Sequence, residues 1–148
     1  MRILAVDYGE ARTGLAISDY TGLIATPLMV LRDRNMDILI GKIAQVTKDN
    51  EVGEIVVGLP LNMDGSKGEK SLKCEMVAEK LKERSKVPVL LFDERLSTVT
   101  AHEIVNANRN TSKSGKSHRK RHRRSDKIVD AIAAAVILEG YLNERGEV

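Results

Sequence analysis

Apolar residues gather in short stretches along the first 31 positions of this chain, and their pattern predicts three strands. The stretches are residues 2–8, 15–18 and 23–31. A turn from Gly9 to Gly14 can join the first two as a hairpin. Pro27 lies inside the third stretch and cannot donate a ladder hydrogen bond, so we expect an edge strand or a bulge there. The chain therefore opens with three antiparallel strands.

Helical and strand patterns alternate in the remainder of the chain. Apolar residues recur at helical spacing in residues 36–46 and 68–85, and buried strands are expected from Glu54 and from Val87. Two further helices are predicted, from residue 97 or 98 to about 108 and from Ser125 to about Glu144. This alternation implies parallel strands joined by crossovers. We expect one α/β domain over residues 1–148, with a mixed sheet and helices on both faces.

Composition narrows the class of protein. With 148 residues and 42% apolar residues, the chain can bury a substantial core as a single domain. The lone Cys74 excludes an internal disulfide and suits a reducing cytosol. The N-terminus does not resemble a signal peptide, and the apolar run 132–138 is far shorter than the ~20 residues that span a bilayer. We expect a soluble cytoplasmic protein.

Charge is concentrated in one segment, which we call the basic segment, residues 113–127. It carries a charge of +7, whereas the remaining chain carries −4. We expect a flexible basic loop over about residues 110–124 that contacts nucleic acid phosphates, with a merely solvated loop as the alternative. The expected phosphate contacts are Lys116, Arg119, Lys120, Arg121, Arg123, Arg124 and Lys127.

Four acids stand where apolar patterns end or are interrupted. Asp7 ends the first strand, Asp93 and Glu94 end the last, and Asp130 is the only polar residue of IVDAIAAAVIL. Carboxyl ends of neighbouring strands meet at one crevice, so if the first and last strands share that edge, Asp7 and Glu94 can face each other there. The final helix can then bring Asp130 beside them. Clustered carboxylates without a Cys or His cluster favour Mg²⁺ or Mn²⁺, and two such ions can cleave a phosphodiester. Each acid taken alone could instead be a turn residue or a helix-start residue.

Four stretches in this order resemble the YqgF family, also called RuvX, of the ribonuclease H-like superfamily. They are VDYGEARTGLAISD, VVGLPLNMDGS, FDERLST and KIVDAIAAAVILEGYL. The resemblance implies a ribonuclease H-like, five-stranded mixed sheet and catalytic, metal-binding roles for Asp7, Glu94 and Asp130. It also places Arg12 and Arg95 near the scissile phosphate.

Function follows from the same resemblance as an expectation. Similar proteins are described as nucleases that mature the 5′ end of 16S ribosomal RNA precursors, and an older description is cleavage of Holliday junctions. A monomer would suffice for the first substrate, and a homodimer would suit the second. A non-catalytic RNA-binding module remains the alternative of another class. In the loop after the fourth strand, Asn62, Asp64 and Gly65 either shape the crevice or form a turn for backbone reasons.

Overall fold

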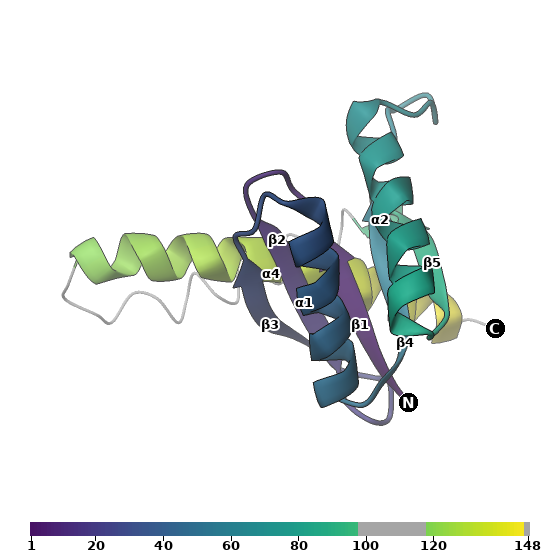
Figure 1. Cartoon of the computed structure of the whole chain (residues 1–148), viewed down its shortest axis with the longest axis horizontal. Helices are drawn as coiled ribbons and strands as arrows, with labels where there is room; N and C mark the ends of the chain where they lie inside the picture. Colours follow the sequence, from purple (N-terminus) through teal and green to yellow (C-terminus); the bar gives the residue numbers. More distant parts are fainter. Residues whose placement is uncertain (98–117, 147–148) are drawn as a thin grey trace.

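A single mixed sheet organises the computed structural model, which describes residues 1–97 and 118–146, with side chains for 1–96, 129 and 131–145. Its strands are β1 (Arg2–Asp7), β2 (Thr13–Ser18), β3 (Ala25–Leu31), β4 (Val52–Leu59) and β5 (Val89–Asp93). Their order is β3-β2-β1-β4-β5. The first three strands pair antiparallel, and β4 is parallel to both β1 and β5 (Figure 1). The predicted fold class is confirmed.

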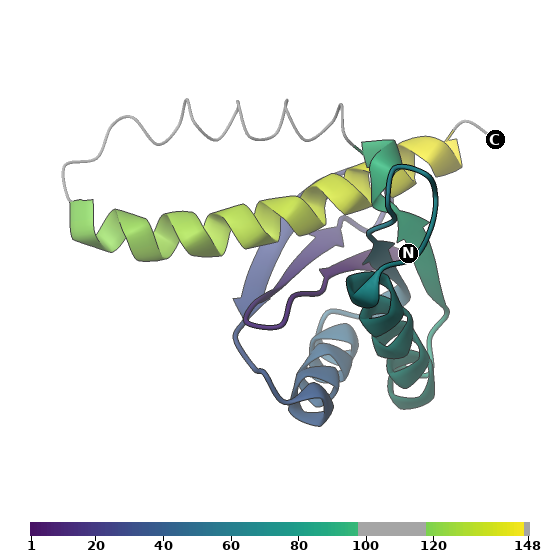
Figure 2. The same ribbon diagram turned by 90° about the horizontal axis from the view of Figure 1, so that it is seen from above.

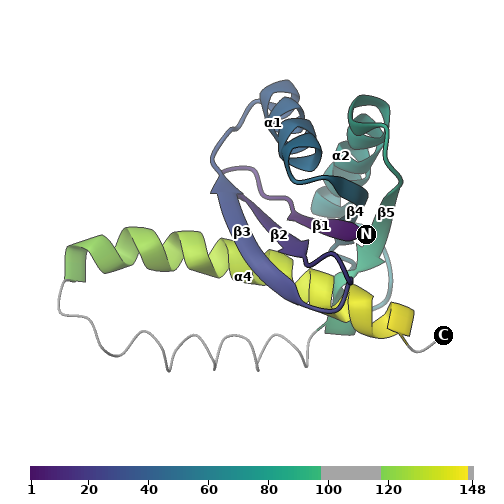
Figure 3. The same cartoon turned by 90° about the horizontal axis from the view of Figure 1, so that it is seen from below.

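Helices cover both faces of this sheet. The helices α1 (Met36–Asp49) and α2 (Glu69–Ser85) pack on one face. The opposite face carries α4 (His118–Gly146), which runs across the sheet in Figures 2 and 3. A short 3₁₀ helix, η1 (Glu94–Ser97), follows β5 directly. Glu94 therefore begins this turn and is not the last residue of the strand.

Two apolar cores form because successive side chains of a strand point to opposite faces. On β1, Leu4 and Val6 belong to the core under α1 and α2, whereas Ile3 and Ala5 belong to the core under α4. The same alternation on β4 sends Val57 to the first core and Val56 to the second. Continuing each alternation puts Asp7 and Gly58 on the face that α4 covers.

The sheet edge at β3 explains how Pro27 is accommodated. β3 pairs only with β2, and the register shifts between Leu15 and Ala16, which lie opposite Met29 and Pro27. The residue between these two partners, Leu28, is the extra residue of a bulge. Both forms of the sequence expectation for Pro27, an edge strand and a bulge, are therefore confirmed.

The two helices on the first face begin differently. At α1, the side chain of Asn35 accepts a hydrogen bond of 3.1 Å from the backbone N–H of Ile38. At α2, Gly68 occupies the cap position and supplies no side-chain hydrogen bond. The N-terminus of α2 thus keeps more of its partial positive charge than a capped helix start does.

The basic segment corrects one prediction. We expected a loop to Arg124 and a helix from Ser125, but α4 already begins at His118. Lysine and arginine are good helix formers, and no glycine or proline occurs between His118 and Glu139, so the helical pattern continues into the charged residues. The helix expected over about 97–108 lies outside the described residues.

A buried acid ties the C-terminal end of α4 to the sheet. Glu54 on β4 is 8% exposed and accepts a hydrogen bond from the Tyr141 hydroxyl, and its other oxygen lies 3.7 Å from Arg145. Burial, together with the hydrogen bond to Glu54, raises the pKa of Tyr141 to about 12.

No helix in the described part of the chain is long and apolar enough to cross a membrane.

Candidate active site

Asp7 and Glu94 lie at the carboxyl edge of the sheet, on either side of β4. Asp7 is the last residue of β1 and pairs with Gly14. Its neighbour Val6 pairs with Val57, and the next residue of β4, Gly58, pairs with Phe92 of β5. Asp7 ends β1 and Glu94 follows β5, and β4 passes between these two strands.

Gly58 is what allows the carboxylate of Glu94 to cross this gap. A Cβ atom built on Gly58 would lie 2.5 Å from Oε1 of Glu94 and 2.6 Å from Cδ1 of Ile137. The glutamate side chain thus extends over the bare backbone of β4, on the face shared with Asp7. Sequence reasoning missed this residue. The available signal was a glycine inside a strand, which often marks close approach by another group.

The electrostatics of Glu94 fit this crowded position. The pKa of Glu94 is raised from 4.5 to about 7, mainly by burial and next by repulsion from Asp7, while the attraction of Lys70 lowers it by less. A partly buried carboxyl that is repelled by a second one gains most from a cation placed between them. The donor set of Asp7 and Glu94 consists only of oxygen, the type of ligand that Mg²⁺ and Mn²⁺ prefer. These two residues therefore fit a divalent metal.

The third acid of the predicted triad lies on α4, but its side chain is outside the described part of the structure. Asp130 is two turns before Ile137, whose side chain contacts Gly58 and belongs to the core under α4. Among the described side chains, no three His, Cys, Asp or Glu residues form a group that could hold a metal. The role of Asp130 stays a prediction.

Replacing Glu94 by Gln should change the pH dependence of stability in the metal-free protein. Because its folded pKa is raised, the folded state binds more protons than the unfolded state between about pH 4.5 and 7, so wild-type stability falls as pH rises through this window. The glutamine variant loses this dependence and should be more stable at pH 8 by about 2 kcal/mol. Urea unfolding in EDTA at pH 4 and at pH 8 measures the free energy of unfolding of each protein. An equal change in this free energy between the two pH values for both proteins would contradict the prediction.

Asp93, next to Glu94, has the opposite environment. Its carboxylate accepts hydrogen bonds of 3.0 Å from Nε and 2.7 Å from an Nη atom of Arg95. These bonds lower the pKa of Asp93, whereas that of Glu94 is raised. Two adjacent acids thus differ: Asp93 is bound to an arginine, and Glu94 lies over β4 beside Asp7. In the structure Arg95 is hydrogen-bonded to Asp93. The role of Arg95 near a phosphate stays a prediction.

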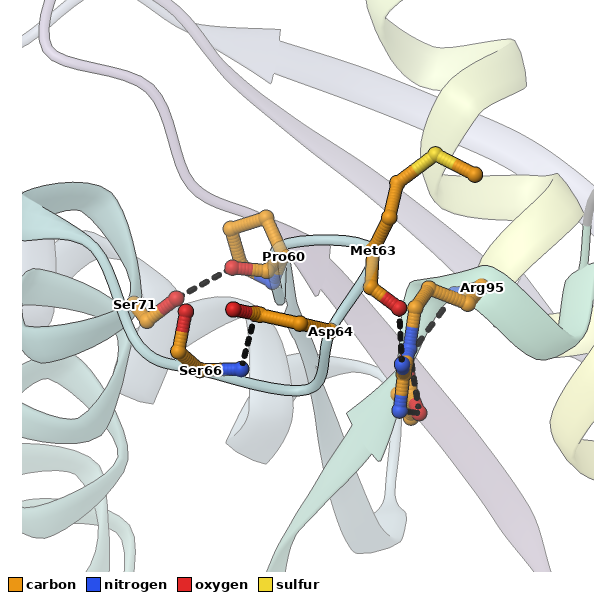
Figure 4. Close-up of polar contacts among 7 residues, drawn as sticks. Pro60, Met63, Asp64, Ser66, Ser71 and Arg95 are labelled. Carbon is orange, nitrogen blue, oxygen red and sulfur yellow. Dashed lines mark hydrogen bonds and ion pairs between the residues drawn. The ribbon is translucent and has the colours of Figure 1, made fainter.

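The loop between β4 and α2 is organised by its own hydrogen bonds. Asp64 accepts a 2.9 Å hydrogen bond from the backbone N–H of Ser66, and the Ser71 hydroxyl donates to the carbonyl of Pro60 (Figure 4). Gly65 has φ of +87°, which favours glycine. Arg95 also donates a 3.4 Å hydrogen bond to the carbonyl of Met63. Asn62, Asp64 and Gly65 therefore have a backbone role, and this loop lies beside η1.

The other basic residues that were predicted to bind nucleic acid differ in how far the structure describes them. Arg12 is exposed in the turn after β1, and Gly9 permits this turn because a Cβ there would lie 2.4 Å from the carbonyl oxygen of Arg12. Lys116 lies outside the described residues. The others are in the first turns of α4, with side chains that are not described: Arg119, Lys120, Arg121, Arg123, Arg124 and Lys127.

Comparison with known proteins extends this picture over nearly the whole chain. A protein of Anaeromyxobacter sp., named "Putative pre-16S rRNA nuclease", is 45% identical over 98% of each chain, and one of Thermoanaerobacter pseudethanolicus with the same name is 37% identical over 98% of each. RuvC of Thermus thermophilus, also solved in complex with a Holliday junction substrate, superposes with a TM-score of 0.62 over 99% of this chain and 97% of its own, at 13% identity. At that identity the likeness supports the fold. Residues 1–144 match the family described as "RuvX: Holliday junction resolvase", and this chain belongs to that family.

Proposed function

We propose that this protein is a divalent-metal-dependent nuclease whose substrate is the 5′ end of a 16S ribosomal RNA precursor. Family membership identifies it as a hydrolase of phosphodiester bonds. The choice of RNA follows from the relatives that are 45% and 37% identical, because both carry the rRNA nuclease name. A cytoplasmic location goes with such a substrate.

The observation that carries the proposal is the position of the Glu94 carboxylate over Gly58, on the face of the sheet that it shares with Asp7. Asp7 is close enough for its negative charge to raise the pKa of Glu94. In this proposal Asp7 and Glu94 hold the metal, and Asp130 completes its ligands from α4. Bound there, Mg²⁺ or Mn²⁺ would activate water and stabilise the charge that develops on the phosphate. The protein's own contribution is to keep the two acids together in a partly buried place.

Cleavage of a Holliday junction is the second candidate. It is supported by the description of the family and by the shared fold with RuvC, which has been solved with a junction. A two-fold symmetric junction would suit a homodimer, whereas trimming of one RNA end needs only a monomer. In both cases the basic residues of the segment 113–127 and Arg12 are proposed to contact the phosphate backbone.

One experiment separates these candidates. A labelled 16S precursor fragment and a labelled four-way junction are incubated side by side with the purified protein, with Mg²⁺ or with EDTA. We expect Mg²⁺-dependent shortening of the precursor and slower or absent junction cleavage. Faster cleavage of the junction would favour the second candidate. Binding of RNA with no cleavage under any metal would indicate the RNA-binding module.

A further inference from the structure

Lys70 lies at the same edge of the sheet as the two acids, but on a different element. It is in the first turn of α2, which begins directly after the loop that follows β4. Lys70 and Cys74 are one helical turn apart and therefore share a face of α2. Cys74 is fully buried in the core under this helix. The stem of Lys70 thus begins on the side of α2 that faces the sheet.

The other lysines of α2 and of the preceding loop form ion pairs, whereas none of the ion pairs between described residues involves Lys70. Among the described residues, the ion pairs of this region are Lys67 with Glu75, Lys73 with Glu10, Lys80 with Asp37 and Lys82 with Glu79. Lys70 is absent from these pairs, and it is exposed. Its ammonium group is therefore available to a ligand.

The position of Lys70 is unfavourable for the helix itself. A helix N-terminus carries partial positive charge, so a lysine in the first turn is repelled. The rest of α2 follows the favourable arrangement, with Glu69 in its first turn and Lys82 and Arg84 in its last. Gly68 leaves the start of the helix without a side-chain cap. An anion bound at this end would be attracted by both the helix and Lys70.

Lys70 also lies within electrostatic reach of the acid pair. Burial is the main cause that raises the pKa of Cys74 to about 12, Glu94 and Asp7 add to this rise, and Lys70 opposes it. Lys70 likewise opposes the rise that burial causes in the pKa of Glu94. One turn further along α2, Lys73 forms an ion pair with Glu10, which is three residues after Asp7. The first turns of α2, and Lys70 with them, therefore lie beside the turn that follows Asp7.

We propose that Lys70 binds a phosphate of the nucleic acid strand held at Asp7 and Glu94, and so fixes where the strand is cut. This inference rests on the nuclease function proposed above. Lys70 approaches from the α2 side of the sheet edge, whereas Glu94, Asp7 and α4 lie on the other face. A nucleic acid strand bound between Lys70 and the two acids would be held at more than one phosphate. This would fix which phosphodiester bond lies at Asp7 and Glu94.

The test compares Lys70→Ala with Lys82→Ala. Both variants remove one lysine from α2, but Lys82 is in the last turn, where a cation favours the helix. We expect Lys70→Ala to cut the 16S precursor fragment about tenfold more slowly, and to melt 1–3 °C higher than wild type by rough estimate. Lys82→Ala should cut at the wild-type rate and melt slightly lower. Lys70→Arg should restore most of the cutting rate.

Binding provides a second readout, one that a structural role would leave unchanged. A fluorescent single-stranded fragment of the precursor is titrated in EDTA at several salt concentrations. Loss of one phosphate contact should reduce the slope of log K against log salt by about 0.7 for Lys70→Ala, and by nothing for Lys82→Ala. An unchanged slope with an unchanged cutting rate would overturn the assignment of Lys70. If the wild-type protein itself cuts neither RNA nor junction, the nuclease function fails, whatever the variants do.

Discussion

Replacement of Asp7 by Asn should slow RNA cleavage by about a thousandfold or more while leaving the fold intact. The amide keeps the shape of the side chain and its capacity to accept a hydrogen bond, but it removes the negative charge that binds a divalent ion. A metal supplies several kcal/mol of transition-state stabilisation, and each 1.4 kcal/mol is about tenfold in rate. Single-turnover cleavage of the labelled 16S precursor at saturating protein measures the loss.

The matched control is Asp49→Asn, the same chemical change at the last residue of α1. Asp49 lies just before β4 begins, hence at the opposite end of the sheet from Asp7, and its carboxylate accepts a 2.7 Å hydrogen bond from the Gln45 side chain. Its variant should cut at the wild-type rate. Equal cutting by both variants would mean that Asp7 does not bind an essential metal or that the activity belongs to a contaminant.

Replacement of Gly58 by Ala should reduce cleavage by about a hundredfold, although the substitution adds a single methyl group without charge. Its Cβ would lie 2.5 Å from Oε1 of Glu94 and 2.6 Å from Cδ1 of Ile137, so both neighbours have to move. A displacement of about 1 Å at a reacting site can cost two orders of magnitude in rate. Crowding of the core under α4 should also destabilise the protein by about 1–3 kcal/mol.

Gly53→Ala is the control for this substitution, on the same strand. The three atoms nearest to a Cβ there all belong to the side chain of Met1, the exposed first residue, which can move away at little cost. Its cutting rate should stay at the wild-type level.

Loss of stability and loss of activity can be separated in the double variant Gly58→Ala, Ile137→Val. The smaller valine relieves the crowding of the core, so stability should partly recover, but the rate should not, because the contact with Glu94 remains. Recovery of both would assign the defect to packing alone.

The strand-end acids show what the sequence could predict about this site. Asp7 and Glu94 each follow an apolar run, although Leu90 and Leu91 of β5 prove to be exposed, and the general behaviour of parallel strands brings such positions to one edge. What the sequence could not supply was the strand between them. The order β1-β4-β5 comes from long-range pairing, and only that pairing shows that Gly58 must lack a side chain.

The start of α4 was wrongly predicted for a different reason. The run of lysine and arginine was interpreted from its net charge as a loop, because like charges repel each other along a chain. Their individual helix propensity favours the opposite outcome, and α4 extends to His118. Pro27 was easier to interpret, since proline has no N–H group and tolerates few positions in a sheet.

The packing of α4 has a consequence for the order in which the protein assembles. α4 is the last helix in the sequence, yet it packs on β1, β2 and β3, which are the first elements, so its docking closes the longest loops of the chain and should be a late, slow event. Before that event, α1 and α2 can already cover one side of the sheet, while Ile3, Ala5 and Val56 stay open to water on the other. A nascent chain at this stage would be prone to aggregate. Its Glu94 would also lack the side chain of Ile137, which lies beside it over Gly58 in the folded protein. The enzyme would therefore acquire its cutting activity only after α4 has been synthesised and has docked on the sheet.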